Sequence, residues 1–449
     1  MEKLDSGLAE WILAEAKSRG ATAAEVLMMG AESLAAGVRL GEVEKLKSSR
    51  ERRLGVRFFC GQSSATASTA EFERAALKEF VANTVTLARL TAADPWSGLP
   101  DAALHPASIA DLALADPDAG IIEAGPALEI ARKGEKAALA FDRRITNSEG
   151  AEFDSGRYRI LFANSNGFCG EYEGSSFSLV VAPIAHDGGA MQQGFWYTSN
   201  RRFAKLEDAE AVGVTSAKRA LRRLGARKVK TTRAPVVFDP DMAAGLIRSL
   251  AGAASGPSLY KGASFLIDRL GSQVMAPGVS IIDDALMPGA LGSKPFDGEG
   301  LPTNRKHLVD QGILKTYLLD CYSARKLKLA PTGNAARSVG QAPTVSTTNL
   351  YLEPGSYSPE QIIGSVKQGL YLTELIGFGV NMVTGDYSRG AGGMWIEDGQ
   401  LAYPVQEITI AGNLKDMFLN LEMIGSDLHW RSSVASPTVK IAEMTIAGA

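Results

Sequence analysis

The sequence has few residues of the kinds that disulfide frameworks, zinc fingers and membrane spans require. Its three cysteines, Cys60, Cys169 and Cys321, lie far apart in 449 residues and follow no metal-binding spacing. Cys60 and Cys169 fall in expected strands, where a buried structural thiol is the expected role. Apolar runs stay short of the roughly 18 residues of a spanning helix. Residues 1–20 are acidic and amphipathic, unlike a signal peptide. We therefore expect a cytoplasmic protein with no membrane partner.

Histidine is equally scarce. None of His105, His186, His307 and His429 is followed by a second histidine or a cysteine within five residues. Metal-binding histidine pairs on one helix are thus excluded, although ligands brought together only by folding are not. A surface or hydrogen-bonding role is expected for each.

An excess of positive charge is missing as well. The net charge is -3 and charged residues make up 22% of the chain, so the sequence carries no sign of a nucleic-acid partner. One small basic cluster lies at the end of an expected helix and just beyond it, and we expect a solvated face there. Its members are Arg219, Arg222, Arg223, Arg227, Lys228 and Lys230.

The length exceeds the size at which a single hydrophobic core usually stops growing, so two domains are expected. Residues 228–234 form a polar linker of Arg, Lys and Thr, and the sequence beyond it is richer in glycine and β-branched residues. We therefore place an N-terminal α/β domain at residues 1–228 and a C-terminal, mostly β domain at residues 229–449.

The N-terminal domain is expected to contain an antiparallel sheet with helices, because period-2 and helical patterns alternate along it. Strands followed by a helix occur twice, and Phe59-Cys60-Gly61 echoes Phe168-Cys169-Gly170, which suggests an internal duplication. Helices are expected at residues 8–19, 71–90, 126–141 and 207–224, with one helical turn at 108–114. Strands are expected at residues 25–30, 33–40, 53–60, 63–69, 158–163, 167–172, 175–185 and 191–198.

The C-terminal domain is expected to open with a buried strand, a turn at Asp239-Pro240 and a helix, over residues 236–256. A second helix is expected at residues 414–423. Strands are expected at residues 279–282, 314–319, 349–352, 369–375, 394–396, 401–405, 407–411 and 439–444. The fold class is therefore α+β.

Two polar stretches could carry chemistry. Asp283-Asp284 and Asp297-Gly298-Glu299 could supply general acid or base carboxylates or bind a hard cation, but the oxygens do not alternate as an EF-hand loop requires. The alternative is a role in turns, with glycines at positive φ. The glycine-rich residues 377–393 lack the Rossmann and Walker spacings, so a mobile loop that covers a groove is expected there.

The opening helix is most informative for what it lacks. Between residues 243 and 254 there is no His, Asp, Glu or Cys, and the only strongly polar side chains are those of Arg248 and Ser249. A hydrolase built on this helix would need its metal ligands there.

Several long motifs of the second half resemble the TldD/PmbA family of peptidase-like proteins. They include DDALMP, FDGEGLPT and PTGNAAR within residues 280–337, and IEDGQLAYPV near the end of the chain. The resemblance implies an N-terminal α/β domain joined to a β-rich C-terminal domain. In the TldD branch, the opening helix carries a His-Glu-x-x-x-His zinc motif, and a cysteine near the C-terminus completes the site.

Laid on this sequence, the zinc motif is absent. The first His falls at Arg248, the Glu at Ser249 and the second His at Ala253, and residues 430–437 contain no cysteine. The resemblance therefore implies the PmbA branch, also called TldE, with no catalytic, cofactor-binding or metal-binding residue of its own.

That branch implies a non-catalytic subunit beside a TldD-type zinc peptidase in a cytoplasmic complex that acts on peptides or unfolded proteins. Its implied roles are peptide degradation, microcin-type maturation and removal of an antitoxin, hence modulation of DNA gyrase. A homodimer or heterodimer is expected. One alternative is a self-sufficient hydrolase that uses Asp283, Asp297 and Glu299. Another is a peptide-binding module without a catalytic partner.

Overall fold

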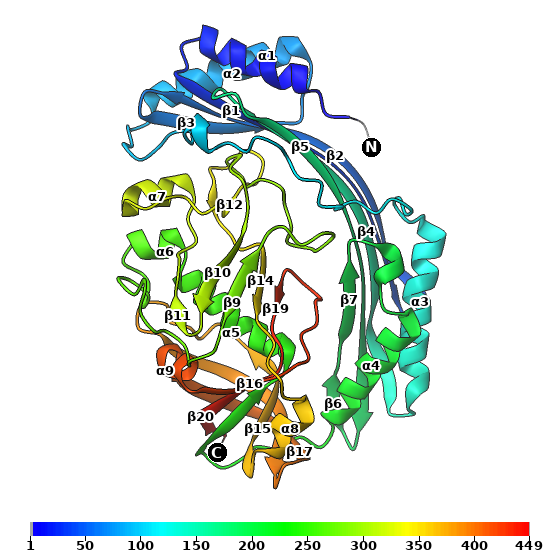
Figure 1. The fold of residues 1–449 in the computed structure, drawn as a ribbon. Coiled ribbons are helices and arrows are strands. Elements are labelled where there is room, and N and C mark those ends of the chain that lie inside the picture. Colours follow the sequence, from blue (N-terminus) through cyan, green and yellow to red (C-terminus); the bar gives the residue numbers. More distant parts are fainter. Residues whose placement is uncertain (1–2, 449) are drawn as a thin grey trace.

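A computed structural model describes residues 3–448 of the chain. A long, strongly curved antiparallel sheet arches over a β-rich C-terminal part (Figure 1). The α+β class and the β-rich second half are confirmed. No helix within residues 3–448 is both long and apolar enough to cross a membrane.

The arched sheet has the strand order β3-β2-β1-β4-β5-β6, and β7 pairs with β5. Every pairing in it is antiparallel. Its strands are β1 (Ala23–Arg39), β2 (Glu42–Cys60), β3 (Ser63–Thr69), β4 (Ile145–Asn164), β5 (Cys169–Asp187), β6 (Ala190–Gln193) and β7 (Trp196–Asn200).

These strands are longer than the sequence predicts. The separate strands expected at residues 25–30 and 33–40 are one strand, β1, and residues 42–52 extend β2 although no strand was expected there. Side chains of residues 42–48 are exposed in succession, so no apolar alternation marks this stretch. Hydrogen bonding to β1 holds it extended, which a hydrophobic pattern does not report.

Two pairs of helices cover the ends of the arched sheet (Figure 1). α1 (Ser6–Ser18) and α2 (Arg74–Leu90) lie at one end, and α3 (Ala124–Phe141) and α4 (Ala209–Arg222) at the other. The order helix, strands, helix therefore occurs twice. The sequence echo is not at equivalent positions, because Cys60 ends β2 while Cys169 begins β5. The duplication stays a prediction.

The predicted helical turn at residues 108–114 is wrong. A 3-10 turn lies at Ala102–Leu104 instead, and the later residues form an irregular segment in which Ala113 has φ +50°. Leu112 and Leu114 are buried, and their carbonyl oxygens accept hydrogen bonds from Gly289 and Ser175. The segment thus runs between the C-terminal part and the arched sheet, and its backbone bonds to these tertiary partners in place of a helix.

The C-terminal part contains two larger sheets. One has the order β17-β16-β15-β8-β20-β18, and a further pairing of β17 with β20 closes it on itself. The other has the order β11-β10-β9-β14-β19. The first comprises β8 (Thr232–Phe238), β15 (Gln368–Ile376), β16 (Asp386–Glu397), β17 (Gln400–Asn413), β18 (Leu421–Ile424) and β20 (Val439–Ala447). The second comprises β9 (Ile281–Asp284), β10 (Arg305–Asp310), β11 (Ile313–Leu314), β14 (Asn349–Leu352) and β19 (Val434–Ala435).

The sheets share a core around α5 (Pro240–Ala253), with β8 before it as predicted. Three short helices were not expected: α6 (Gly256–Tyr260), α7 (Cys321–Leu327) and α8 (Pro359–Gly364). The helix predicted at residues 414–423 ends early, at Leu419, because the following residues pair with β20 as β18. Most of the strand predicted at residues 314–319 is likewise absent.

The glycine-rich residues 377–393 are not one mobile loop. Their second half belongs to β16, where glycines allow strands to approach closely. A Cβ on Gly393 would lie 2.0 Å from the carbonyl oxygen of Tyr371. Close strand packing therefore explains this part of the composition better than mobility does.

A short hairpin joins the two halves of the molecule. β12 (Ala335–Ala336) pairs with β13 (Thr344–Val345), and we call residues 335–347 the crossing hairpin. Its loop packs on the arched sheet so closely that a Cβ on Gly55 would lie 2.5 Å from the Gly340 nitrogen. The division into domains 1–228 and 229–449 stays a prediction.

Candidate functional site

α5 begins at a well-defined cap. Asp239 accepts a hydrogen bond from the backbone of Asp241, and Pro240 occupies the first turn, where its missing N–H costs nothing. Ala243, Leu246 and Leu250 of the helix are buried in the core. The helix is therefore held rigidly, with its remaining face available to form a site.

The three positions that align with the zinc motif do not converge. Arg248 is exposed and donates to the Ser432 hydroxyl at 3.2 Å, while Ser249 donates to the Gly245 carbonyl within the helix. Ala253 points into the core and is fully buried. These positions therefore lie on different faces of α5.

Zinc, which the family resemblance implies for the TldD branch, does not fit these residues. A guanidinium and a methyl group offer no lone pair, and one neutral hydroxyl is a poor ligand. Across residues 3–448, no group of three His, Cys, Asp or Glu side chains could hold a metal ion. That α5 binds no metal stays a prediction until metal content is measured.

A groove nevertheless lies beside α5. It encloses ≈ 330 Å³ and is lined by helix residues on one side and by the end of the crossing hairpin and β19 on the other. The lining residues are Arg248, Ala251, Gly252, Ser255, Leu318, Val345, Ser346, Thr347 and Val434. Small residues on α5 leave the backbone accessible, so an extended chain could approach it closely.

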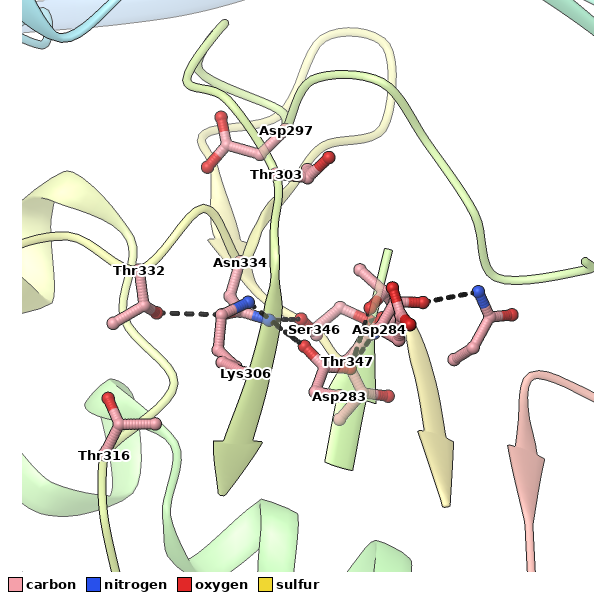
Figure 2. Close-up of polar contacts among 12 residues, drawn as sticks. Asp283, Asp284, Asp297, Thr303, Lys306, Thr316, Thr332, Asn334, Ser346 and Thr347 are labelled. Atoms are coloured by element: carbon pink, nitrogen blue, oxygen red, sulfur yellow. Dashed lines mark hydrogen bonds and ion pairs between the residues drawn. The ribbon is translucent and has the colours of Figure 1, made fainter. Parts of the chain in front are cut away.

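Asp283 holds residues adjacent to the hairpin side of this groove, and Figure 2 shows its polar contacts. One carboxylate oxygen accepts from the Thr348 backbone and hydroxyl, at 2.6 and 2.8 Å. The other accepts from Asn334 at 2.8 Å and lies 3.4 Å from the Lys306 amine. The side chain is fully buried, so Asp283 has no oxygen left for a substrate or metal, and its role is structural.

Asp297 and Glu299 lie apart from Asp283, and Figure 2 shows Asp297 away from the Asp283 network. Asp297 accepts from three backbone N–H groups, those of Glu299, Leu301 and Ala335. Glu299 accepts from the Cys321 backbone at 2.8 Å. Burial, reinforced by the nearby Asp297 charge, raises the pKa of Glu299 to about 8. Glu299 is therefore protonated at neutral pH, and burial raises the pKa of Asp297 as well, although its three backbone donors oppose that shift.

The predicted carboxylate site is thus split into two environments. Asp284 accepts from the Leu286 backbone and lies 3.7 Å from Arg305. Gly300 has φ +80°, as the turn role requires, whereas Gly298 is not at positive φ and packs instead against the backbone of Ala336. The turn role accounts for most of this stretch, and the raised pKa of Glu299 is the exception.

The histidines are dispersed. His105 contacts the Asn164 amide at 3.3 Å and packs on Phe168, and burial lowers its pKa. His186 lies on β5 and His307 on β10, while His429 lies in the segment before β19.

The burial of the cysteine thiols differs from what the sequence predicts. Cys169 is exposed and Cys60 is half-buried, because both lie at strand ends, so the prediction of buried thiols there is wrong. Cys321 is the buried one, at the start of α7.

The basic cluster is only in part the solvated face that was expected: Arg227, Lys228 and Lys230 are exposed, whereas Arg219, Arg222 and Arg223 are half-buried. Arg223 pairs with Glu374 at 2.6 Å, and Arg227 lies 3.6 Å from the ring centre of Tyr403. Arg222 is half-buried near Tyr371, and burial lowers its pKa. These arginines join α4 and the residues after it to the C-terminal part, a tertiary contact that no local pattern reveals.

Comparison with known proteins agrees with the resemblance. Models described as PmbA/TldA metallopeptidase domain 1, central domain and C-terminal domain match residues 24–88, 118–224 and 231–448. The chain is 38% identical to "Metalloprotease PmbA" from Escherichia coli O157:H7 over 436 residues, or 97% of this chain and 94% of the relative.

Two solved structures share the fold. A candidate modulator of DNA gyrase from Bacteroides thetaiotaomicron VPI-5482 superposes with a TM-score of 0.92 at 27% identity, covering 99% of this chain and 98% of that one. TldE from Thermococcus kodakarensis superposes with a TM-score of 0.89 at 21% identity, covering 98% and 100%. At that identity the second likeness concerns the fold alone.

Proposed function

Because the chain belongs to the PmbA/TldD metallopeptidase family, we propose that it is the non-catalytic subunit of a two-component metalloprotease. Its partner is a TldD-type zinc peptidase, with which it forms a cytoplasmic complex that degrades or matures peptides. Removal of an antitoxin, and through it an effect on DNA gyrase, is the proposed cellular consequence, since a structural relative is described as a candidate gyrase modulator.

One observation carries this proposal: the groove beside α5 is present, but it lacks the side chains that could bind zinc. Arg248, Ser249 and Ala253 occupy the aligned positions and cannot bind zinc. This supports a chain that offers a groove wall and a scaffold, with hydrolysis assigned to the partner.

The groove has the properties of a peptide contact surface. Arg248 is exposed at its edge, and its single hydrogen bond, to Ser432, leaves other guanidinium N–H groups available to a peptide carbonyl or carboxylate. Ala251 and Gly252 present little side chain, so a bound strand could lie against the helix.

The decisive experiment mixes this chain with the TldD-type protein of the same organism. We expect a complex in size-exclusion chromatography with light scattering, zinc in proportion to the partner alone, and hydrolysis of an unfolded peptide. Arg248→Ala in this chain should weaken peptide binding yet leave the hydrolysis rate at saturating peptide near that of the native complex, whereas mutating the partner's motif Glu should abolish hydrolysis. The reverse pattern would refute the assignment.

The two alternatives make different predictions for the same samples. A self-sufficient hydrolase would cleave peptide in the absence of a partner and lose activity in Glu299→Gln, yet Asp283 and Asp297 are already occupied by internal donors. A simple peptide-binding module would bind peptide but form no complex with a zinc peptidase.

A further inference from the structure

A second, larger cavity lies between the arched sheet and the C-terminal part. It encloses ≈ 480 Å³ and shares no lining residue with the groove beside α5. Strands β1, β4 and β5 form one side, and residues around Lys294–Gly298 and the crossing hairpin form the other. Its volume is in the range of small-molecule sites, and the proposed peptidase role does not use it.

Most of the cavity wall is apolar and rigid. Leu27, Phe162 and Phe296 are buried and belong to one small cluster. Tyr172 packs edge-to-face on Phe296, with ring centres 5.2 Å apart. Such a wall suits the flat or branched body of an organic molecule and gives little to a hydrated ion.

Two cationic side chains enter this wall with few partners. Lys294 donates to the carbonyl oxygen of Ala335 at 3.2 Å, and among the described residues it takes part in no ion pair. Arg337 has only 5% of its side chain exposed; it pairs with Glu25 at 2.7 Å, but its Nε has no hydrogen-bond partner. Glu25 is shared with Arg57, at 3.5 Å, so the buried cations are only partly compensated, which favours a site completed by an anion.

The facing carboxylate does not neutralise this charge. Asp297 directs its oxygens at three backbone N–H groups, and it is the only acidic residue of the cavity lining, against Lys294, Arg337 and Arg53. Burial lowers the pKa of Lys294, and the nearby Asp297 and Asp283 charges oppose this shift without cancelling it.

We propose that this cavity binds a small carboxylic acid with an aromatic or branched apolar body. The carboxylate lies at Lys294, within reach of Arg337, and the body packs between Phe162, Tyr172 and Phe296. A carboxylate is chosen over a phosphate because the wall offers side-chain cations and apolar surface, without the backbone N–H cradle that phosphates use.

Calorimetric titration of the full-length chain tests the proposal, with N-acetyl-L-phenylalanine as the probe and its amide as the uncharged match. We expect the acid to bind at least about tenfold more tightly than the amide. Lys294→Met should remove this preference, whereas Lys415→Met, at an exposed site on α9 (Leu414–Leu419), should keep it.

A cavity-filling variant distinguishes a loss of binding from a loss of fold. Met29 lines the cavity and is half-buried, so Met29→Trp should block both acid and amide without altering charge, while the far-UV circular dichroism stays native. Acetyl-Gly-Gly-Phe carries the same carboxylate at the end of a longer peptide, so it tests whether the cavity accepts a peptide C-terminus or only a small free acid. Binding of either probe supports the site. Equal affinity for acid and amide, or no binding of the acid at millimolar concentration, would overturn the proposal.

Discussion

At the scale of single residues, the buried carboxylates differ in how many donors they face. Asp283 has four contacts and Asp297 three backbone donors, whereas Glu299 has the one backbone donor from Cys321. A carboxylate is stable as an anion in the interior only when donors replace water. Glu299, with the fewest donors, is the carboxyl that keeps its proton at neutral pH.

Replacing Asp283 should destabilise the protein. In Asp283→Asn, one oxygen becomes an amide that faces the Asn334 amide and the Lys306 amine, which leaves a buried cation unpaired. We expect the free energy of unfolding to fall by about 3 kcal/mol in urea titrations. Asp284→Asn is the matched control, since its ion pair with Arg305 is loose and its hydrogen bond survives. Equal losses in both variants would contradict this account.

Glu299 should make stability depend on pH. The folded chain keeps a proton that the unfolded chain releases near the ordinary glutamate pKa, so stability falls as pH rises from there to about 8. In Glu299→Gln this loss is absent. Between pH 5.5 and 7.5 the native protein should lose about 3 kcal/mol relative to the variant.

Unfolding midpoints of both proteins at several pH values measure this difference. Parallel pH profiles for the native chain and Glu299→Gln would show that the carboxyl is ionised in the fold.

Residue roles were only partly predictable from the sequence. The sequence marks three acidic residues in this region, Asp283, Asp297 and Glu299. Their hydrogen-bond partners are distant in the sequence: Thr348 lies 65 positions from Asp283 and Asn334 lies 51. Lys294 gives no local signal, since one lysine in a loop is ordinary. Long-range contacts, which no spacing encodes, account for the difference.

At the scale of elements, the sequence predicted the larger helices and most strands because their apolar periods are long. α5 was predicted with its Asp239-Pro240 start, since capping residues leave a local mark. α7 was missed although Asp320 and Ser323 form a capping box, because the helix is too short to show a period. Charged residues 42–49 of β2 were missed because only pairing with β1 makes them a strand.

The crossing hairpin should be sensitive to one added methyl group. Gly340 has φ +78°, and a Cβ there would lie 2.6 Å from the Cβ of Ser68. Gly340→Ala should therefore lower the free energy of unfolding by more than the roughly 1 kcal/mol that positive φ alone costs. Gly41, with φ +82° and open space around it, is the matched position for that backbone cost. Similar losses in Gly340→Ala and Gly41→Ala would mean that the hairpin is not held against the sheet.

At the scale of the whole molecule, arginine side chains form hydrogen bonds that link the C-terminal part to the arched sheet and to the segments that connect its elements. Arg201 donates to the carbonyl oxygens of Ala290 and Leu291, both at 2.8 Å. Arg325 donates to the carbonyl oxygens of Trp96, Gly98 and Leu99 in the connection after α2. A planar guanidinium can serve several carbonyls at once, which an ammonium cannot match.

Arg325→Lys should loosen the connection without unfolding the chain. We expect chymotrypsin to cleave after Trp96 several-fold faster in this variant, because the amine cannot hold three carbonyls. Arg269→Lys, at an exposed position, should be cleaved like the native protein. Unchanged cleavage in Arg325→Lys would show that other contacts fix this segment.

The crossing hairpin also lines three separate spaces in succession. Residues 335–341 line the cavity under the arched sheet, residues 342–344 line a neighbouring one of ≈ 400 Å³, and residues 345–347 line the groove beside α5. A molecule that shifts this segment in one space therefore changes the energy of occupying the others. Thermodynamic reciprocity then makes the effect mutual, so peptide in the groove and an organic acid beneath the sheet should alter each other's affinity by the same factor.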